Sequence, residues 1–163
     1  MDHVDTLLKQ LLDEKTAGEA AFQIAEISDP RALEGLLAAL KNESPLIRRS
    51  GVMGLASTED SKAVPFIMDM LADPDIGVRA SAAFAISKLG NADCIPRLSS
   101  HFRDSINIDA HLCRQFIVAL TDICGHDCAD TISIGLESSL AEVRSTTAEF
   151  LGHLGNPSII KRL

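Results

Sequence analysis

The chain has 163 residues, of which 46% are hydrophobic and 23% charged, and this is the composition of a folded protein of one-domain size. Its formal charge of -8 argues against nucleic acid or an anionic membrane as partner, because proteins that bind them attract phosphate with clustered Lys and Arg. The sequence also lacks an apolar run long enough to cross a bilayer and a basic signal-peptide start, so we expect a cytoplasmic protein.

The apolar residues recur with the period of a helix, at i, i+4, i+5, i+8 and i+11 of each repeated unit. Pro behind a capping residue marks helix starts at Asp29-Pro30, Ser44-Pro45, Asp73-Pro74 and Asn156-Pro157. We expect a short final helix after Pro157. Before it, in chain order, the predicted helices span 3–14, 16–27, 30–41, 45–57, 62–72, 75–89, 92–103, 109–124, 128–138 and 141–154.

These helices form a repeat. The segment from Val78 to Gly90 aligns with segments 31 and 62 residues earlier, and with segments 34 and 65 residues later. A unit of two helices is too small to bury its own apolar face, so neighbouring units must stack and share one core. The sequence therefore predicts a single all-α domain over residues 1–163, an α-α superhelix of about five antiparallel helix pairs.

The segment from Asp73 to Gly90, DPDIGVRASAAFAISKLG, resembles the HEAT repeat of the phycobilisome-lyase type. The resemblance extends over nearly the whole chain. It implies a HEAT-like solenoid whose second helices line the concave side. Because this scaffold is shared by lyase subunits, adaptors and regulators, the resemblance specifies the fold better than the function.

The same resemblance implies a role for three Arg residues that recur in the strongest units, Arg48, Arg79 and Arg144. They are expected to bond to acids of the turns, such as Asp73 or Asp75. Two units carry another residue at the Arg position, so a continuous ladder of Arg and Asp is interrupted there.

Motifs that carry chemistry are sparse. The chain has no Gly-x-Gly, and none of its five His residues is followed by Glu, which excludes a metal pair of the His-Glu type. The Cys residues are expected to remain thiols in a reducing compartment. Cys124, His126 and Cys128 are zinc-compatible ligands, but Cys128 aligns with packed interior positions, so we expect no metal, no cofactor and no catalytic residues.

A stripe of apolar side chains is predicted on the concave face of the second helices. Relative to the core-facing residues of its helix, Phe84 points nearly opposite, since a helix turns by about 100° per residue. The alternative is that adjacent helices cover the stripe. The predicted partner-binding residues are Phe22, Met53, Phe84 and Val118, with Arg49, Lys88 and Arg114 beside them.

An exposed apolar stripe in a polar rim is typical of a surface that binds a protein or peptide. The leading interpretation is therefore a non-catalytic adaptor or regulatory subunit, and the alternative is a subunit like those of bilin lyases. Only six residues follow Pro157. Either the chain was cut from something longer, or this end meets a partner or a second copy of the chain.

Overall fold

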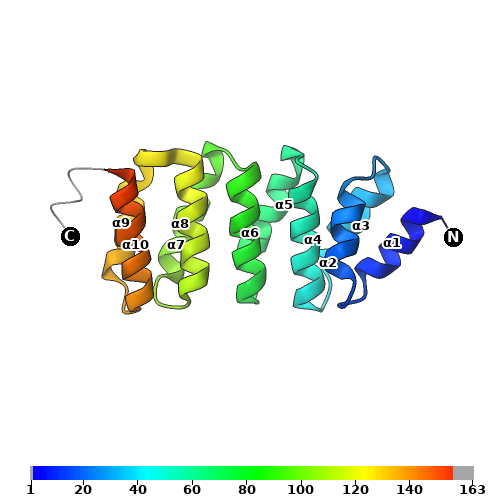
Figure 1. Ribbon diagram of the computed structural model, residues 1–163, viewed down its shortest axis with the longest axis horizontal. Helices are drawn as coiled ribbons and strands as arrows, with labels where there is room; N and C mark the ends of the chain where they lie inside the picture. Colours follow the sequence, from blue (N-terminus) through cyan, green and yellow to red (C-terminus); the bar gives the residue numbers. More distant parts are fainter. Residues whose placement is uncertain (1, 156–163) are drawn as a thin grey trace. The chain divides into compact units, whose positions relative to one another are not determined.

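The structure is a computed structural model that describes residues 2–155, and this part of the chain contains α-helices and short 3-10 helices but no strand (Figure 1). None of its helices combines the length and apolar character that a membrane span requires. The chain divides into two compact units, Met1–Leu89 and Gly90–Leu163. The single domain expected over residues 1–163 stays a prediction, and the helix expected after Pro157 lies outside the described residues.

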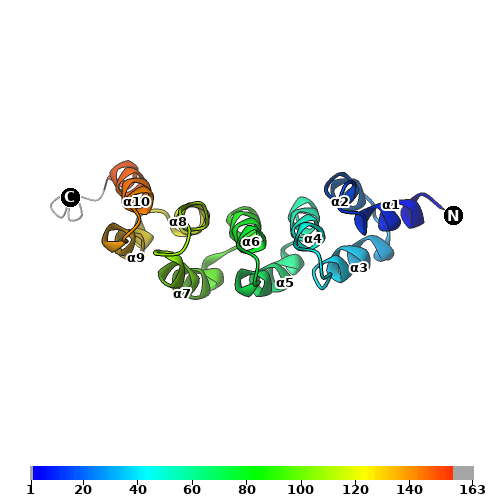
Figure 2. The same ribbon diagram turned by 90° about the horizontal axis from the view of Figure 1, so that it is seen from below.

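The first unit consists of three helix pairs. Helices α2, α4 and α6 lie side by side in one layer, and α3 and α5 lie behind them (Figure 2). The elements are α1 (His3–Leu11), α2 (Ala17–Ala25), α3 (Pro30–Ala39), α4 (Pro45–Ser57), η1 (Ser61–Ala63), α5 (Val64–Asp69), η2 (Met70–Ala72) and α6 (Ile76–Leu89).

The second unit has the same plan with two helix pairs. Helices α8 and α10 form one layer, and α7 and α9 form the other (Figure 2). The elements are η3 (Ala92–Cys94), α7 (Ile95–Ser105), α8 (Ala110–Cys124), η4 (Gly125–Cys128), α9 (Ala129–Ser133), η5 (Ile134–Glu137) and α10 (Ala141–Leu154). The predicted sequence of helix pairs is thus confirmed within residues 2–155.

Small residues allow the second helices of the first unit to pack closely. A Cβ atom added at Gly54 of α4 would lie 2.5 Å from the Leu36 side chain and 3.0 Å from the carbonyl oxygen of Ala21 in α2. On α6, Ala82 and Ala83 are fully buried. The layer of second helices therefore depends on side chains no larger than a methyl group at these contacts.

Proline marks two of the predicted helix starts correctly and one incorrectly. Helices α3 and α4 begin at Pro30 and Pro45, but α6 begins at Ile76, two residues after Pro74. The reason is that Asp75, not Asp73, caps α6: its carboxylate accepts a hydrogen bond from the Val78 N–H at 3.0 Å. The predicted start at Asn156-Pro157 lies outside the described residues.

Arg48 joins two turns of the first unit. Its Nε and Nη2 atoms donate to the two carboxylate oxygens of Asp73 at 2.7 and 2.8 Å, and its Nη1 atom donates to the backbone oxygens of Asn42 and Glu43 at 2.9 and 2.8 Å. Both side chains are largely buried, with 11% of Arg48 and 3% of Asp73 exposed. This pair is the Arg and Asp contact that the repeat predicted.

The other two Arg residues make different contacts from those expected. Arg79 donates to the backbone oxygen of Asp73 at 2.7 Å, and Arg144 donates to the backbone oxygen of Ser138 at 2.7 Å. The prediction that these two bond to turn carboxylates is wrong, because the Asp73 carboxylate is already occupied by Arg48 and each guanidinium reaches the carbonyls of its own preceding turn.

Candidate functional site

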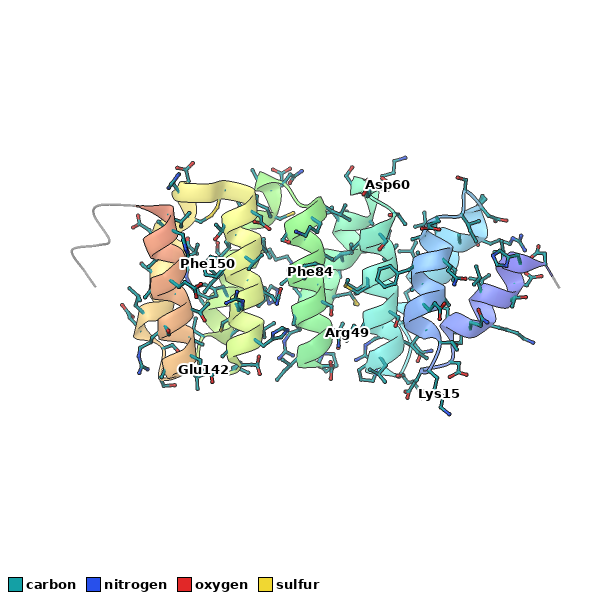
Figure 3. All side chains as sticks on the ribbon, in the orientation of Figure 1. Lys15, Arg49, Asp60, Phe84, Glu142 and Phe150 are labelled. Carbon is teal, nitrogen blue, oxygen red and sulfur yellow. A yellow bond between two sulfur atoms is a disulfide. The ribbon has the colours of Figure 1, made fainter. Side chains whose placement is uncertain are left out.

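The predicted apolar stripe is present in the first unit on the layer formed by α2, α4 and α6. Phe22 is 49% exposed and Phe84 is 37% exposed, while Met53 between them is half-buried. Figure 3 marks Phe84 on this layer. These three side chains, here called the aromatic strip, form an apolar surface that the helices of the first unit leave accessible.

Two cations accompany the aromatic strip. The Lys88 Nζ atom lies 5.4 Å from the centre of the Phe84 ring, in the geometry of a cation–π contact. Arg49 of α4 is exposed (Figure 3). Flat aromatic surface beside positive charge suits a planar ligand that carries anionic groups.

In the second unit, the two predicted residues lie on α8. Val118 is half-buried, and Arg114 is exposed with its guanidinium 5.6 Å from the centre of the Phe150 ring of α10. Sequence alignment placed Glu149 in the stripe and missed Phe150. A signal was present, since the aligned positions in other units are Gly54 and Ala85, and a Phe there is too large for the packing position that those residues occupy.

The cysteine loop differs from its prediction. Cys124 and Cys128 form a disulfide with their Cα atoms 5.9 Å apart, while Cys94 and Cys113 are free and buried. The expectation of four thiols is wrong for this pair because Gly125, with φ at 54°, turns the chain directly after α8 and brings Cys128 back toward Cys124. Disulfide sulfurs are not thiolate ligands, so the weak zinc candidate of Cys124, His126 and Cys128 lacks two ligands in this structure.

Metal and nucleophile chemistry find little support in the described part of the chain. Residues 2–155 contain no group of three His, Cys, Asp or Glu side chains that could hold a metal ion. The Cys113 thiol is 1% exposed and donates to the backbone oxygen of Ser105 at 3.1 Å. Burial, with a smaller effect of Asp109, raises the pKa of the Cys113 thiol to about 12, so it stays protonated and is a poor nucleophile.

The disulfide predicts the number of reactive thiols. Protein unfolded without a reductant should show two reactive thiols per chain, those of Cys94 and Cys113, and reduction should raise the number to all four Cys residues. A colorimetric thiol titration measures both values. The Cys124→Ser variant is the control, because it should release the Cys128 thiol without any reductant. Four reactive thiols in the unreduced parent chain would contradict the disulfide.

A model of HEAT repeats matches residues 4–87 and 33–113, which together cover residues 4–113 and thus more than half of the chain. The chain belongs to the HEAT-repeat family. As a HEAT-repeat protein it has the all-α fold class that its 31-residue spacing predicted.

Similar proteins agree on this fold. The phycocyanobilin lyase subunit alpha of Picosynechococcus sp. (strain PCC 7002) is 35% identical over 81 residues, which are 45% of this chain and 30% of the relative. The complex of CpcE and CpcF of phycocyanin lyase from Nostoc sp. PCC7120 gives a TM-score of 0.72 at 21% identity, over 97% of this chain and 67% of the other. An engineered protein gives 0.53 at 15% identity, over 95% of this chain and 97% of its own.

These relatives confirm the resemblance to the phycobilisome-lyase type of repeat and correct the functional interpretation. The leading interpretation, a non-catalytic adaptor that is not an enzyme, is wrong, since both natural proteins are parts of lyases of the phycobilin class. The error has a physical source. A solenoid that holds a pigment needs no short catalytic motif, so the absence of such motifs could not separate an adaptor from a lyase subunit.

Proposed function

We propose that this HEAT-repeat chain acts as a subunit of a bilin lyase, which holds a linear tetrapyrrole and delivers it to a Cys of a phycobiliprotein. The 35% identity to a phycocyanobilin lyase subunit supports this proposal, although the chain matches only 30% of that relative's length. The structural observation that carries it is the aromatic strip with Lys88 and Arg49 beside it.

The chemistry of the pigment fits this surface. A linear tetrapyrrole has flat conjugated rings and two propionate carboxylates. The rings can stack on Phe22 and Phe84, and the carboxylates can pair with Lys88 and Arg49. Since the Cys113 thiol is buried and protonated, the chain's part in the reaction is to bind and orient the pigment, and the attacking thiol belongs to the acceptor protein.

We further propose that the chain works with a protein partner in the cytoplasm. The Nostoc relative was solved as a complex of two lyase subunits, which supports a second protein as partner. The C-terminal segment after Pro157, where a partner or a second copy was predicted to bind, lies outside the described residues.

The proposal is tested by mixing the purified chain with phycocyanobilin. We expect a change in the visible absorption band and pigment that stays with the protein during gel filtration. Phe84→Glu should weaken binding at least about tenfold, because it removes a ring from the strip and adds a charge that repels the propionates.

Phe66→Glu is the matched control, because Phe66 is 46% exposed but lies on α5, in the other layer of the same unit. Its affinity for the pigment should equal that of the parent chain. Lack of any bound pigment in the parent, or equal loss in both variants, would refute a pigment site on the aromatic strip.

A further inference from the structure

Two adjoining clefts lie within the second unit, where α8 and α10 begin. The first has a volume of about 380 Å³ and the second of about 440 Å³, and they share Ala110 and Glu142. Volumes of this size are typical of sites for small organic molecules. The first cleft is lined by Ala110, His111, Arg114, Glu142, Ser145 and Thr146, and the second by Ile108, Asp109, Ala110, Leu140, Ala141 and Glu142.

The first cleft is equipped for an anionic group. His111 and Arg114 are three residues apart on α8 and so lie on the same face of that helix. Arg114 is exposed and takes part in none of the ion pairs found among residues 2–155. Its contact with the Phe150 ring holds the guanidinium near α10, from which Ser145 and Thr146 offer hydroxyl groups.

The second cleft is mainly apolar at its far end. Ile108 is 57% exposed, and Leu140 and Ala141 line the opposite side. Asp109 adds little free charge there, because its carboxylate accepts a hydrogen bond from the Leu112 N–H at 2.8 Å and caps α8. Glu142 lies where the clefts join, so an anionic group is favoured only at the end that holds Arg114.

We propose that this pair of clefts binds one propionate-bearing pyrrole of the linear tetrapyrrole, with the carboxylate paired to the Arg114 guanidinium. The inference rests on the proposed function and extends it by assigning a specific carboxylate contact. Arg suits this contact because its planar guanidinium can donate two parallel hydrogen bonds to one carboxylate. The pyrrole ring and its alkyl groups then lie along Ile108 and Leu140.

The test compares phycocyanobilin with its dimethyl ester, in which both propionates are masked. Dissociation constants are measured from the change in pigment absorption. The parent chain should bind the free acid at least about tenfold more tightly than the ester, and Arg114→Gln should lose most of this preference. Arg114→Lys should keep part of it, since the charge remains but the paired hydrogen bonds do not.

Arg103→Gln is the matched control, because Arg103 is an exposed Arg on α7 of the same unit and lines neither cleft. It should keep the full preference for the acid. Equal preference in the parent chain and Arg114→Gln would overturn the assignment of Arg114 while leaving pigment binding intact. If the parent chain binds neither pigment, the proposed function itself fails.

A separate arm addresses a protein ligand. Each variant is titrated with a phycobiliprotein subunit that carries no pigment, and binding is followed by calorimetry. The inference predicts the same affinity for the parent chain and Arg114→Gln. If Arg114→Gln weakens only the binding of this protein, the clefts are a protein contact and the inference is overturned.

Discussion

Replacing Ala83 with Glu should lower the free energy of unfolding by 3 kcal/mol or more, on the order of the largest effects of single substitutions. Ala83 is fully buried on α6. A Glu side chain there has neither room nor a partner for its charge, so it must displace a neighbouring helix or bury an unpaired carboxylate. Thermal melting followed by circular dichroism measures the effect, because the chain has no Trp and no Tyr to serve as fluorescent probes.

Phe84→Glu is the internal control for this experiment. The substitution adds the same charged side chain one residue later, but Phe84 is 37% exposed, so stability should change by no more than about 0.5 kcal/mol. A variant at Phe84 that melts as early as the variant at Ala83 would show that the aromatic strip is part of the core. The proposed pigment surface of the first unit would then be lost with it.

Replacing Asp73 with Ala should destabilise the chain by about 3 kcal/mol, because it leaves the largely buried Arg48 guanidinium without its counter-charge. The loss falls at the lower end of the range for buried pairs, since Arg48 keeps its bonds to the backbone oxygens of Asn42 and Glu43. The backbone N–H of Asp75 also loses its acceptor at 2.8 Å. Denaturation with urea, followed by circular dichroism, gives the free energy directly.

The same carboxylate predicts how stability depends on pH. Burial raises the pKa of the Asp73 carboxyl, but the hydrogen bonds from Arg48 and the Asp75 N–H, with the charges of Arg48 and Arg79, outweigh burial and lower the pKa below its usual value. Because the folded-state pKa is depressed, the contribution is fully present above the unfolded-state pKa of about 3.9 and is lost as the pH falls below it. The Asp73→Ala variant should therefore lose less stability than the parent between neutral pH and pH values below about 4.

Arg31→Gln is the control for an ion pair at the surface. Arg31 contacts Asp2, Asp5 and Asp29 at 2.8 to 3.0 Å, but all of these groups are accessible to water. Solvent and salt screen such contacts, so this variant should melt much closer to the parent than Asp73→Ala does. A loss in Arg31→Gln as large as in Asp73→Ala would mean that burial does not decide the strength of these pairs.

The sequence by itself determined the helices and their order. The predicted spans 45–57 and 141–154 coincide with α4 and α10, and the predicted span 75–89 differs from α6 by one residue. Such accuracy follows from physics that acts over a few residues, namely the apolar period of a helix and the capping of its first turn. The repeat spacing then fixed the fold class, since a pair of helices buries its apolar face only by stacking on the next pair.

Only the tertiary structure decided which side chains meet. The sequence named Arg114 as a candidate but placed Glu149 in its stripe, whereas the structure brings Phe150 to the Arg114 guanidinium and opens the clefts between α8 and α10. It also joined Cys124 to Cys128 and assigned Asp73 to Arg48 alone. These contacts depend on side-chain directions, and on distances between residues brought together by the fold, which a helical period does not encode.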